Sequence, residues 1–127
     1  MRVHHAGSAT DDADDLADLF STVFDAPVAH SEQFDGMAIR FLELDNGYFE
    51  LLEPTHDDGP IADYLDNGPG IHHLAIETDD IDAALKTAND HGINLIDDEP
   101  RPGAWDHEVA FLHPSSTGGV LIEFVAE

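Results

Sequence analysis

Two stretches of the sequence share one pattern: HHAGSATDD at residues 4–12 and GIHHLAIETDD at residues 70–80. In each, a His-His pair is followed after four residues by Thr-Asp-Asp. Thr and Asp oxygens accept hydrogen bonds from the free N–H groups of a first helical turn, and acidic residues suit the positive end of a helix. The residues before them are typical of a strand. We therefore expect a strand followed by a helix twice, with His5 and His73 68 residues apart.

The rest of each half predicts the same further elements. Pro27 ends the first helix, and Asp45-Asn46-Gly47 predicts a hairpin because Asn and Gly tolerate the positive φ of tight turns. His91-Gly92 ends the second helix, with Gly as a left-handed cap. A short helix is expected at 61–65 and a Pro/Gly-rich loop at 100–103. The expected strands are 2–9, 28–34, 37–44 and 48–52, then 71–77, 93–96, 109–112 and 120–125.

This order predicts a tandem duplication of a βαβββ module. Two half-size modules, each with one exposed sheet face, can pair into a larger sheet with a shared cleft. We expect an α+β fold in which the two modules form one curved mixed sheet around a metal cleft. A chain of 127 residues suits a single domain, 1–127. Module 1 is about 1–54, a connector with a short helix is 55–69, and module 2 is about 70–127.

The composition is strongly acidic. The chain has 28 Asp and Glu against 4 Lys and Arg, a formal net charge of −24 at pH 7. Because the acids are spread along the chain, they do not form a separate tail. Nucleic acid is excluded as a partner, since phosphate contacts need clustered Lys and Arg. A partner with a basic surface and adaptation to high salt both explain the charge. We favour the second, because at ~1 M salt the Debye length falls to ~3 Å.

Several other classes are excluded by what the sequence lacks. It has no cysteine, so it offers neither a disulfide framework nor a thiolate metal site. It has no apolar run long enough to span a bilayer, and its first residues lack the apolar core of a signal peptide. We expect a cytoplasmic protein, in a cell interior of high salt, with no membrane partner.

Four side chains at matching positions of the two halves predict a metal site. His5 and His73 lie in the first strands, and Glu50 and Glu123 lie among apolar residues of the last strands. A carboxylate in an apolar strand is costly to bury unless it is paired or coordinated. Two imidazoles and two carboxylates suit a divalent transition metal, and an octahedral ion keeps two positions for substrate or water. The first histidine of each pair should face the other side of its strand.

These features resemble the vicinal oxygen chelate superfamily, which includes glyoxalases, bleomycin resistance proteins and dioxygenases. Within it, three stretches resemble the methylmalonyl-CoA epimerase family: ELLEP at 50–54, GIHHLA at 70–75 and FLHPSSTGGVLIE at 111–123. The loop DEPRPG at 98–103 also fits. The resemblance covers nearly the whole chain and is weakest in the first strand.

The resemblance implies a function. It implies an isomerase of propionate metabolism that interconverts the (2R) and (2S) forms of methylmalonyl-CoA by 1,1-proton transfer through a metal-stabilised enolate. One divalent ion per subunit, cobalt before manganese, nickel or zinc, would be held by His5, Glu50, His73 and Glu123. In the family, position 50 is Gln or Glu, and the Glu of this chain should tighten cation binding. The resemblance also suggests a homodimer.

Matching positions to the family does not identify the acid–base residues of this chain. Some relatives carry a Glu three residues after a Gly that precedes the third strand, but counting from Gly36 reaches Ile39, which cannot act as a base. If the hairpin has a two-residue loop, Glu43 shares the sheet face of Glu50 and, partly buried, is the expected base. A three-residue loop would turn Glu43 to solvent. Glu123 is the expected second base.

Arg101 is the cation expected near the substrate, and two functions other than epimerisation are also considered. Arg101 lies in the loop that resembles the family's substrate loop, so it is expected to bind the substrate or else to pair with a nearby acid. A glyoxalase I (lactoylglutathione lyase)-like isomerase shares the fold and the ligand set. A non-catalytic small-molecule-binding protein of the superfamily would lack the four ligands. Dioxygenases keep three protein ligands, so Glu50 argues against that activity.

Overall fold

The computed structural model describes all 127 residues, Met1–Glu127. The chain forms two compact units: His5–His72, and Met1–His4 together with His73–Glu127. Four strands of the eight-stranded sheet and a helix that packs on them make up most of each unit. No helix is long and apolar enough to cross a membrane. The repeated strand-then-helix order that the sequence predicts is confirmed.

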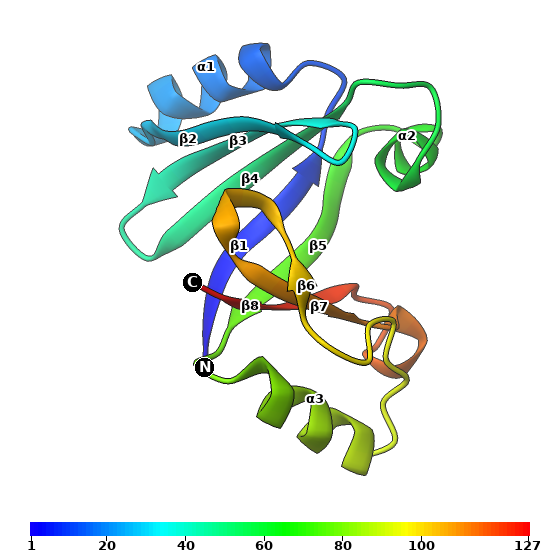
Figure 1. Ribbon diagram of the computed structural model, residues 1–127. Coiled ribbons are helices and arrows are strands. Elements are labelled where there is room, and N and C mark those ends of the chain that lie inside the picture. The colour runs from blue at the N-terminus through cyan, green and yellow to red at the C-terminus, as the bar shows by residue number, and fades with distance from the viewer. The chain divides into compact units, whose positions relative to one another are not determined.

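The first module runs β1 (Arg2–Ala9), α1 (Ala13–Phe24), β2 (Val28–Phe34), β3 (Met37–Leu44) and β4 (Gly47–Pro54), followed by α2 (Pro60–Leu65). The strand order is β2-β3-β4-β1, with β1 parallel to β4 and the other neighbours antiparallel. Helix α1 covers one face of this sheet (Figure 1), where its alanines pack on Leu42 and Leu51. The opposite face is therefore left for other side chains.

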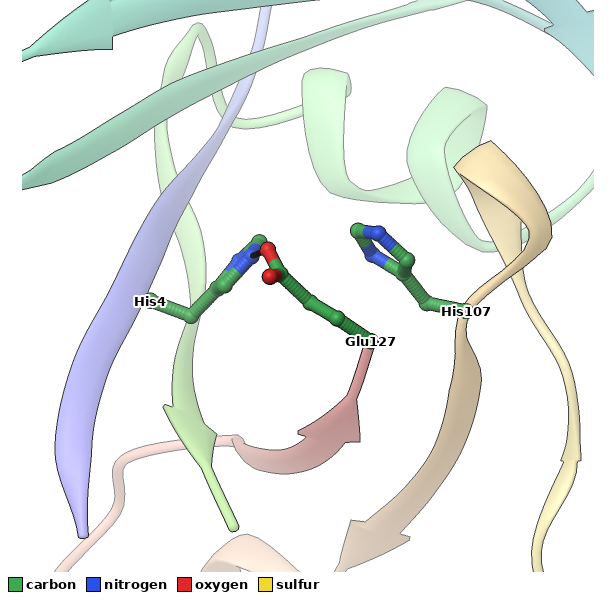
Figure 2. Close-up of side chains that lie close together, drawn as sticks. All are labelled: His4, His107 and Glu127. Atoms are coloured by element: carbon green, nitrogen blue, oxygen red, sulfur yellow. Dashed lines mark hydrogen bonds and ion pairs between the residues drawn. The ribbon is translucent and has the colours of Figure 1, made fainter. Parts of the chain in front are cut away.

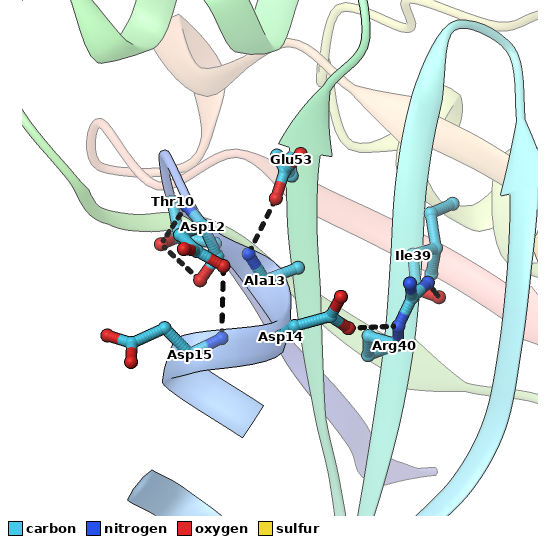
Figure 3. Close-up of polar contacts among 8 residues, drawn as sticks. All are labelled: Thr10, Asp12, Ala13, Asp14, Asp15, Ile39, Arg40 and Glu53. Atoms are coloured by element: carbon cyan, nitrogen blue, oxygen red, sulfur yellow. Dashed lines mark hydrogen bonds and ion pairs between the residues drawn. The ribbon is translucent and has the colours of Figure 1, made fainter. Parts of the chain in front are cut away.

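The Thr-Asp-Asp sequences start both helices as predicted. Asp12 and Asp80 are the N-cap residues, and each accepts a hydrogen bond from the backbone N–H three residues on, at 3.0 Å. Figure 3 shows the α1 cap, where Glu53 of β4 also accepts from the Ala13 N–H at 2.7 Å. These bonds satisfy N–H groups that have no partner within the helix. The cap thus ties the start of α1 to the last strand of its module.

The second module repeats this order. It comprises β5 (Gly70–Glu77), α3 (Ile81–Asp90), β6 (Arg101–Pro102), the 3-10 turn η1 (Ala104–Asp106), β7 (Glu108–Leu112), the 3-10 turn η2 (Pro114–Ser116) and β8 (Ile122–Ala126). The strand order is β5-β8-β7-β6, with β5 parallel to β8. The apolar face of α3 packs on Ala110, Leu112 and Phe124. The side chains at alternate positions of these strands occupy the other face.

One predicted strand is wrong. Residues 93–96 make a single bridge, from Leu95 to Leu112, instead of a strand. The Asp97 carboxylate accepts the Phe111 N–H at 2.8 Å, so a side chain takes a hydrogen bond that a neighbouring strand would otherwise accept. On the side of β7 away from β8, the paired strand is instead the two-residue strand Arg101–Pro102, within the segment predicted to be a loop.

Candidate metal centre

The first module brings one histidine and one glutamate together. His5 is 3% exposed and Glu50 is 6% exposed. The His5 Nε2 lies 3.2 Å from Glu50 Oε1. In the parallel pairing of β1 with β4, His5 lies beside Tyr48, so its side chain shares the face of Glu50 two residues on. This face is opposite to the one that α1 covers.

The second module repeats the pair. His73 is 4% exposed and Glu123 is 7% exposed. The His73 Nε2 lies 3.8 Å from Glu123 Oε1. Glu123 pairs with Ala75 in the parallel β5–β8 ladder, so it shares the face of His73 two residues earlier. That face is again opposite to the module's helix, which packs on Phe124.

A phenylalanine completes each pair, and neither was predicted from the sequence. Phe41 lies directly across from Glu50, and its ring meets the His5 ring edge-on at 5.5 Å and 86°. Phe111 lies directly across from Glu123, and its ring meets the His73 ring at 5.7 Å and 79°. Because the rings limit imidazole rotation, each Nε2 is held toward its carboxylate. The sequence signal was a phenylalanine in the strand before each glutamate, at 41 and at 111.

The donors fit a divalent transition ion chemically. Each module supplies one imidazole nitrogen and one carboxylate oxygen, all more than nine-tenths buried. Buried carboxylates cost free energy unless they are paired or coordinate a metal. Nitrogen and oxygen donors of this kind suit cobalt, nickel, zinc or manganese better than calcium or magnesium, which prefer oxygen donors alone.

The first histidines of the two pairs have other contacts. His4 is 1% exposed, and its Nε2 bonds Glu127 Oε1 at 2.7 Å. The His72 ring packs edge-on against Tyr64 at 5.4 Å. The two positions, which look equivalent in the sequence, therefore lie in different surroundings.

The structure tests the position of Glu43. Leu44 pairs with Gly47, so the hairpin has a two-residue loop, as the prediction required. Phe41 pairs with Glu50, and Glu43 lies on the same face as Phe41 two residues later. The expected partial burial is wrong: Glu43 is exposed, because it lies beside the turn at the end of β3.

The sheet face of Phe41 and Glu50 carries another carboxylate, which was not predicted from the sequence. In the β2–β3 ladder, Glu32 lies directly across from Ile39, and His30 lies directly across from Phe41. The His30 Nε2 contacts Glu32 Oε1 at 3.2 Å, and both side chains are little more than a quarter exposed. The two-residue turn Asp35-Gly36 sets this register, since Phe34 pairs with Met37, and the β-bulge between Val28 and His30 lies beyond it.

Arg101 lies on the corresponding face of the second module. It pairs with Val109 across β6 and β7, and its guanidinium lies over the Phe111 ring at 5.4 Å. Its Nε also donates to Asp97 Oδ1 at 3.0 Å, with 45% of the side chain exposed. The expected acid partner is therefore present. The aromatic contact places the cation beside the ring that supports His73.

The chain is similar in sequence to known proteins of one superfamily. Residues 4–111 match the model of the glyoxalase/bleomycin resistance protein/dioxygenase superfamily. The chain is 38% identical to the mitochondrial methylmalonyl-CoA epimerase of Dictyostelium discoideum, over 96% of this chain and 76% of that protein. It is 34% identical to the ethylmalonyl-CoA/methylmalonyl-CoA epimerase of Cereibacter sphaeroides, over 96% and 95%.

A solved structure extends the similarity to the fold. A methylmalonyl-CoA epimerase in complex with methylmalonyl-CoA and NH4+ matches with a TM-score of 0.94 and 33% identity, over 99% of this chain and 94% of that one. The fold class predicted from the sequence, two βαβββ modules of the vicinal oxygen chelate type, is confirmed.

Proposed function

Because the chain belongs to the glyoxalase/bleomycin resistance protein/dioxygenase superfamily, we propose its activity from the relatives that match it throughout: it is a methylmalonyl-CoA epimerase, an isomerase that interconverts the (2R) and (2S) forms. The observation that carries this proposal is the doubled pair of a buried histidine and a buried glutamate, each against a phenylalanine. A non-catalytic binding protein of the superfamily has no need for this buried donor set.

We further propose that His5, Glu50, His73 and Glu123 hold one divalent ion per subunit, with cobalt as the first candidate. When bound, such an ion acts as a Lewis acid that stabilises the negative charge developed on the substrate's thioester and carboxylate. The protein keeps the four donors buried and away from water. Burial strengthens their electrostatic attraction for a cation, because the surroundings have a lower dielectric constant than water.

Epimerisation needs a proton removed from one face of the carbon between the thioester and the carboxylate, and a proton returned to the other face. We propose Glu123 for one face, with Glu43 as the base for the other. Glu32 is the alternative to Glu43, since it lies across from Ile39 and is held by His30. Both alternatives lie on the sheet face that carries Glu50.

The coenzyme A end of the substrate carries phosphates, whereas the protein has a net charge of −24. We propose that Arg101 binds this end, because its guanidinium is fixed between the Asp97 carboxylate and the Phe111 ring. A high-salt, cytoplasmic setting would screen the repulsion between protein and phosphate. We also propose a homodimer, which sedimentation equilibrium would test.

The proposal is tested by loading the metal-free chain with Co²⁺, Mn²⁺, Ni²⁺ or Zn²⁺ and assaying two substrates. We expect (2R)-methylmalonyl-CoA to be converted to its epimer, and the hemithioacetal of methylglyoxal and glutathione to be left unchanged. Conversion of the hemithioacetal alone would assign the chain to the glyoxalase I reaction instead. Turnover of neither substrate with any of the ions would reject both enzymatic functions.

A further inference from the structure

A second cluster of metal-ligating side chains lies in the unit formed by Met1–His4 and His73–Glu127. His4, His107 and Glu127 each offer one ligand atom, and these atoms all lie within 4.8 Å of one another. Figure 2 shows the three side chains converging from β1, from the residue before β7 and from the residue after β8. None of the three belongs to the four-residue set proposed for the catalytic ion.

His4 and Glu127 form the inner part of the cluster. The His4 Nε2 lies 2.7 Å from Glu127 Oε1, and His4 is 1% exposed. The hydrogen bond from His4 lowers the pKa of the Glu127 carboxyl below its usual value. A carboxylate oxygen and an imidazole nitrogen thus lie side by side, and both are ligand atoms that zinc accepts.

His107 is held in place by its own loop. Its ring lies edge-on to the His4 ring, at 5.3 Å and 90°, and the Trp105 indole stacks on it at 5.5 Å and 26°. Trp105 and Asp106 both have left-handed φ angles, 61° and 58°. Each such residue costs about 1–3 kcal/mol, so the surroundings must hold this conformation in place.

A glycine makes this loop possible. The Gly103 N–H donates to the His107 carbonyl at 2.8 Å, which closes the loop. A Cβ on Gly103 would lie 2.7 Å from Val109 Cγ1, so the loop packs directly on β7. The strained loop and the close packing fix the position of the His107 imidazole.

We propose that His4, His107 and Glu127 form a second divalent-metal site, of the class that takes zinc. Two imidazoles and one carboxylate are a known zinc ligand set, with the fourth position open to water or another ligand. His107 is half-buried and Glu127 is exposed, so solvent reaches the site. Calcium and magnesium are disfavoured because two of the three donors are nitrogen. The ion would join the strand β1 to the ends of β7 and β8.

The test compares zinc bound per chain in the wild type, in His107→Ala and in His56→Ala. His56 is an exposed histidine outside the cluster, so its variant controls for the loss of any imidazole. Equilibrium dialysis in 2 M KCl followed by elemental analysis suppresses weak binding to surface carboxylates. We expect His107→Ala to bind one zinc ion fewer than both the wild type and His56→Ala. Equal zinc content in all three chains would overturn the proposal.

A second readout uses stability, and neither readout depends on epimerase activity. A ligand that binds the folded chain raises its thermal midpoint by mass action. The midpoint rise on adding zinc should be smaller in His107→Ala and in Glu127→Gln than in His56→Ala. Equal rises in the three variants would contradict a site at this cluster. All the compared chains keep His5, Glu50, His73 and Glu123, so an ion bound there contributes equally to each of them. The test therefore stays valid even if those four residues bind no ion.

Discussion

At the scale of single residues, Glu50 is the ligand whose chemistry is easiest to change. Its side chain is buried, with Oε1 3.2 Å from His5 Nε2, and Gln has the same shape without the charge. We predict that Glu50→Gln weakens Co²⁺ binding about tenfold or more, which is ~1.4 kcal/mol or more, because a buried negative charge is lost beside the cation. Competition with a chromophoric chelator measures the dissociation constant.

The control for this prediction is Glu108→Gln, which removes the same charge from an exposed position of β7. It should change the dissociation constant by less than about twofold, because exposed charges are screened. Similar affinities for Glu50→Gln and Glu108→Gln would mean that Glu50 does not contact the ion.

The two carboxylates of the first sheet can be separated by isotope exchange. We predict that Glu43→Gln lowers epimerase kcat by about 10²–10⁴-fold, the usual contribution of a general base. The variant should still exchange the C2 proton of one epimer with D₂O, since the base on the other face is intact. Nuclear magnetic resonance of each epimer follows this exchange.

Glu32→Gln is the matched variant for the same experiment. If Glu43→Gln keeps full activity and Glu32→Gln shows the one-sided exchange instead, the base is Glu32. If both variants keep full activity, neither carboxylate transfers the proton, and the proposed assignment of the first base is wrong.

Individual residues of the site also show what could be predicted from the sequence and what could not. The four ligands were predicted because they repeat in type and position, and in the structure they are buried and lie in pairs within each module. Glu32 was not found, because the two-residue turn Asp35-Gly36, which pairs Phe34 with Met37 and so places Glu32 across from Ile39, was not recognised in the sequence. The exposure of Glu43 was misjudged, because the hairpin fixes its face but not how closely the end of a strand is covered.

At the scale of elements, the repeated Thr-Asp-Asp predicts equal roles for two N-caps. Asp12 and Asp80 accept equivalent hydrogen bonds in α1 and α3. We predict that Asp12→Ala and Asp80→Ala each lower the free energy of unfolding by about 1 kcal/mol, the usual cost of a lost cap. Urea denaturation at fixed KCl measures this change.

Asp11→Ala and Asp79→Ala are the controls, since these exposed neighbours carry the same charge. Removing a negative charge from so acidic a chain should itself be neutral or slightly stabilising. Equal effects of the cap variants and of their neighbours would assign the loss to charge and not to capping.

Element prediction succeeded where local chemistry determines the structure. The bounds of β1, β2 and β3 agree with the sequence prediction, because alternation, Pro27 and the Asn-Gly turn define them. The strand expected at 93–96 failed, because the Asp97 side chain occupies the Phe111 N–H. Whether a side chain replaces a backbone carbonyl as the acceptor of a sheet hydrogen bond depends on tertiary packing. It leaves no local pattern in the sequence.

At the scale of the whole molecule, the net charge of −24 predicts a salt requirement. We predict that the urea midpoint rises between 0.1 M and 2 M KCl, because the Debye length shortens from ~10 Å to less than ~3 Å and screens the repulsion. An equal midpoint at the two salt concentrations would favour the alternative explanation, a partner with a basic surface. Sucrose at matched osmolality is the control for preferential exclusion.

The central claim is that the repeated histidines and glutamates support proton transfer at the carbon between a thioester and a carboxylate. Its most direct measurement is deuterium incorporation into methylmalonyl-CoA in D₂O, with and without a divalent ion. We predict incorporation that requires the ion, stops on chelation and is lost in His73→Ala, while His56→Ala behaves as the wild type. Absence of incorporation with every ion, or incorporation that survives both chelation and His73→Ala, would contradict the claim.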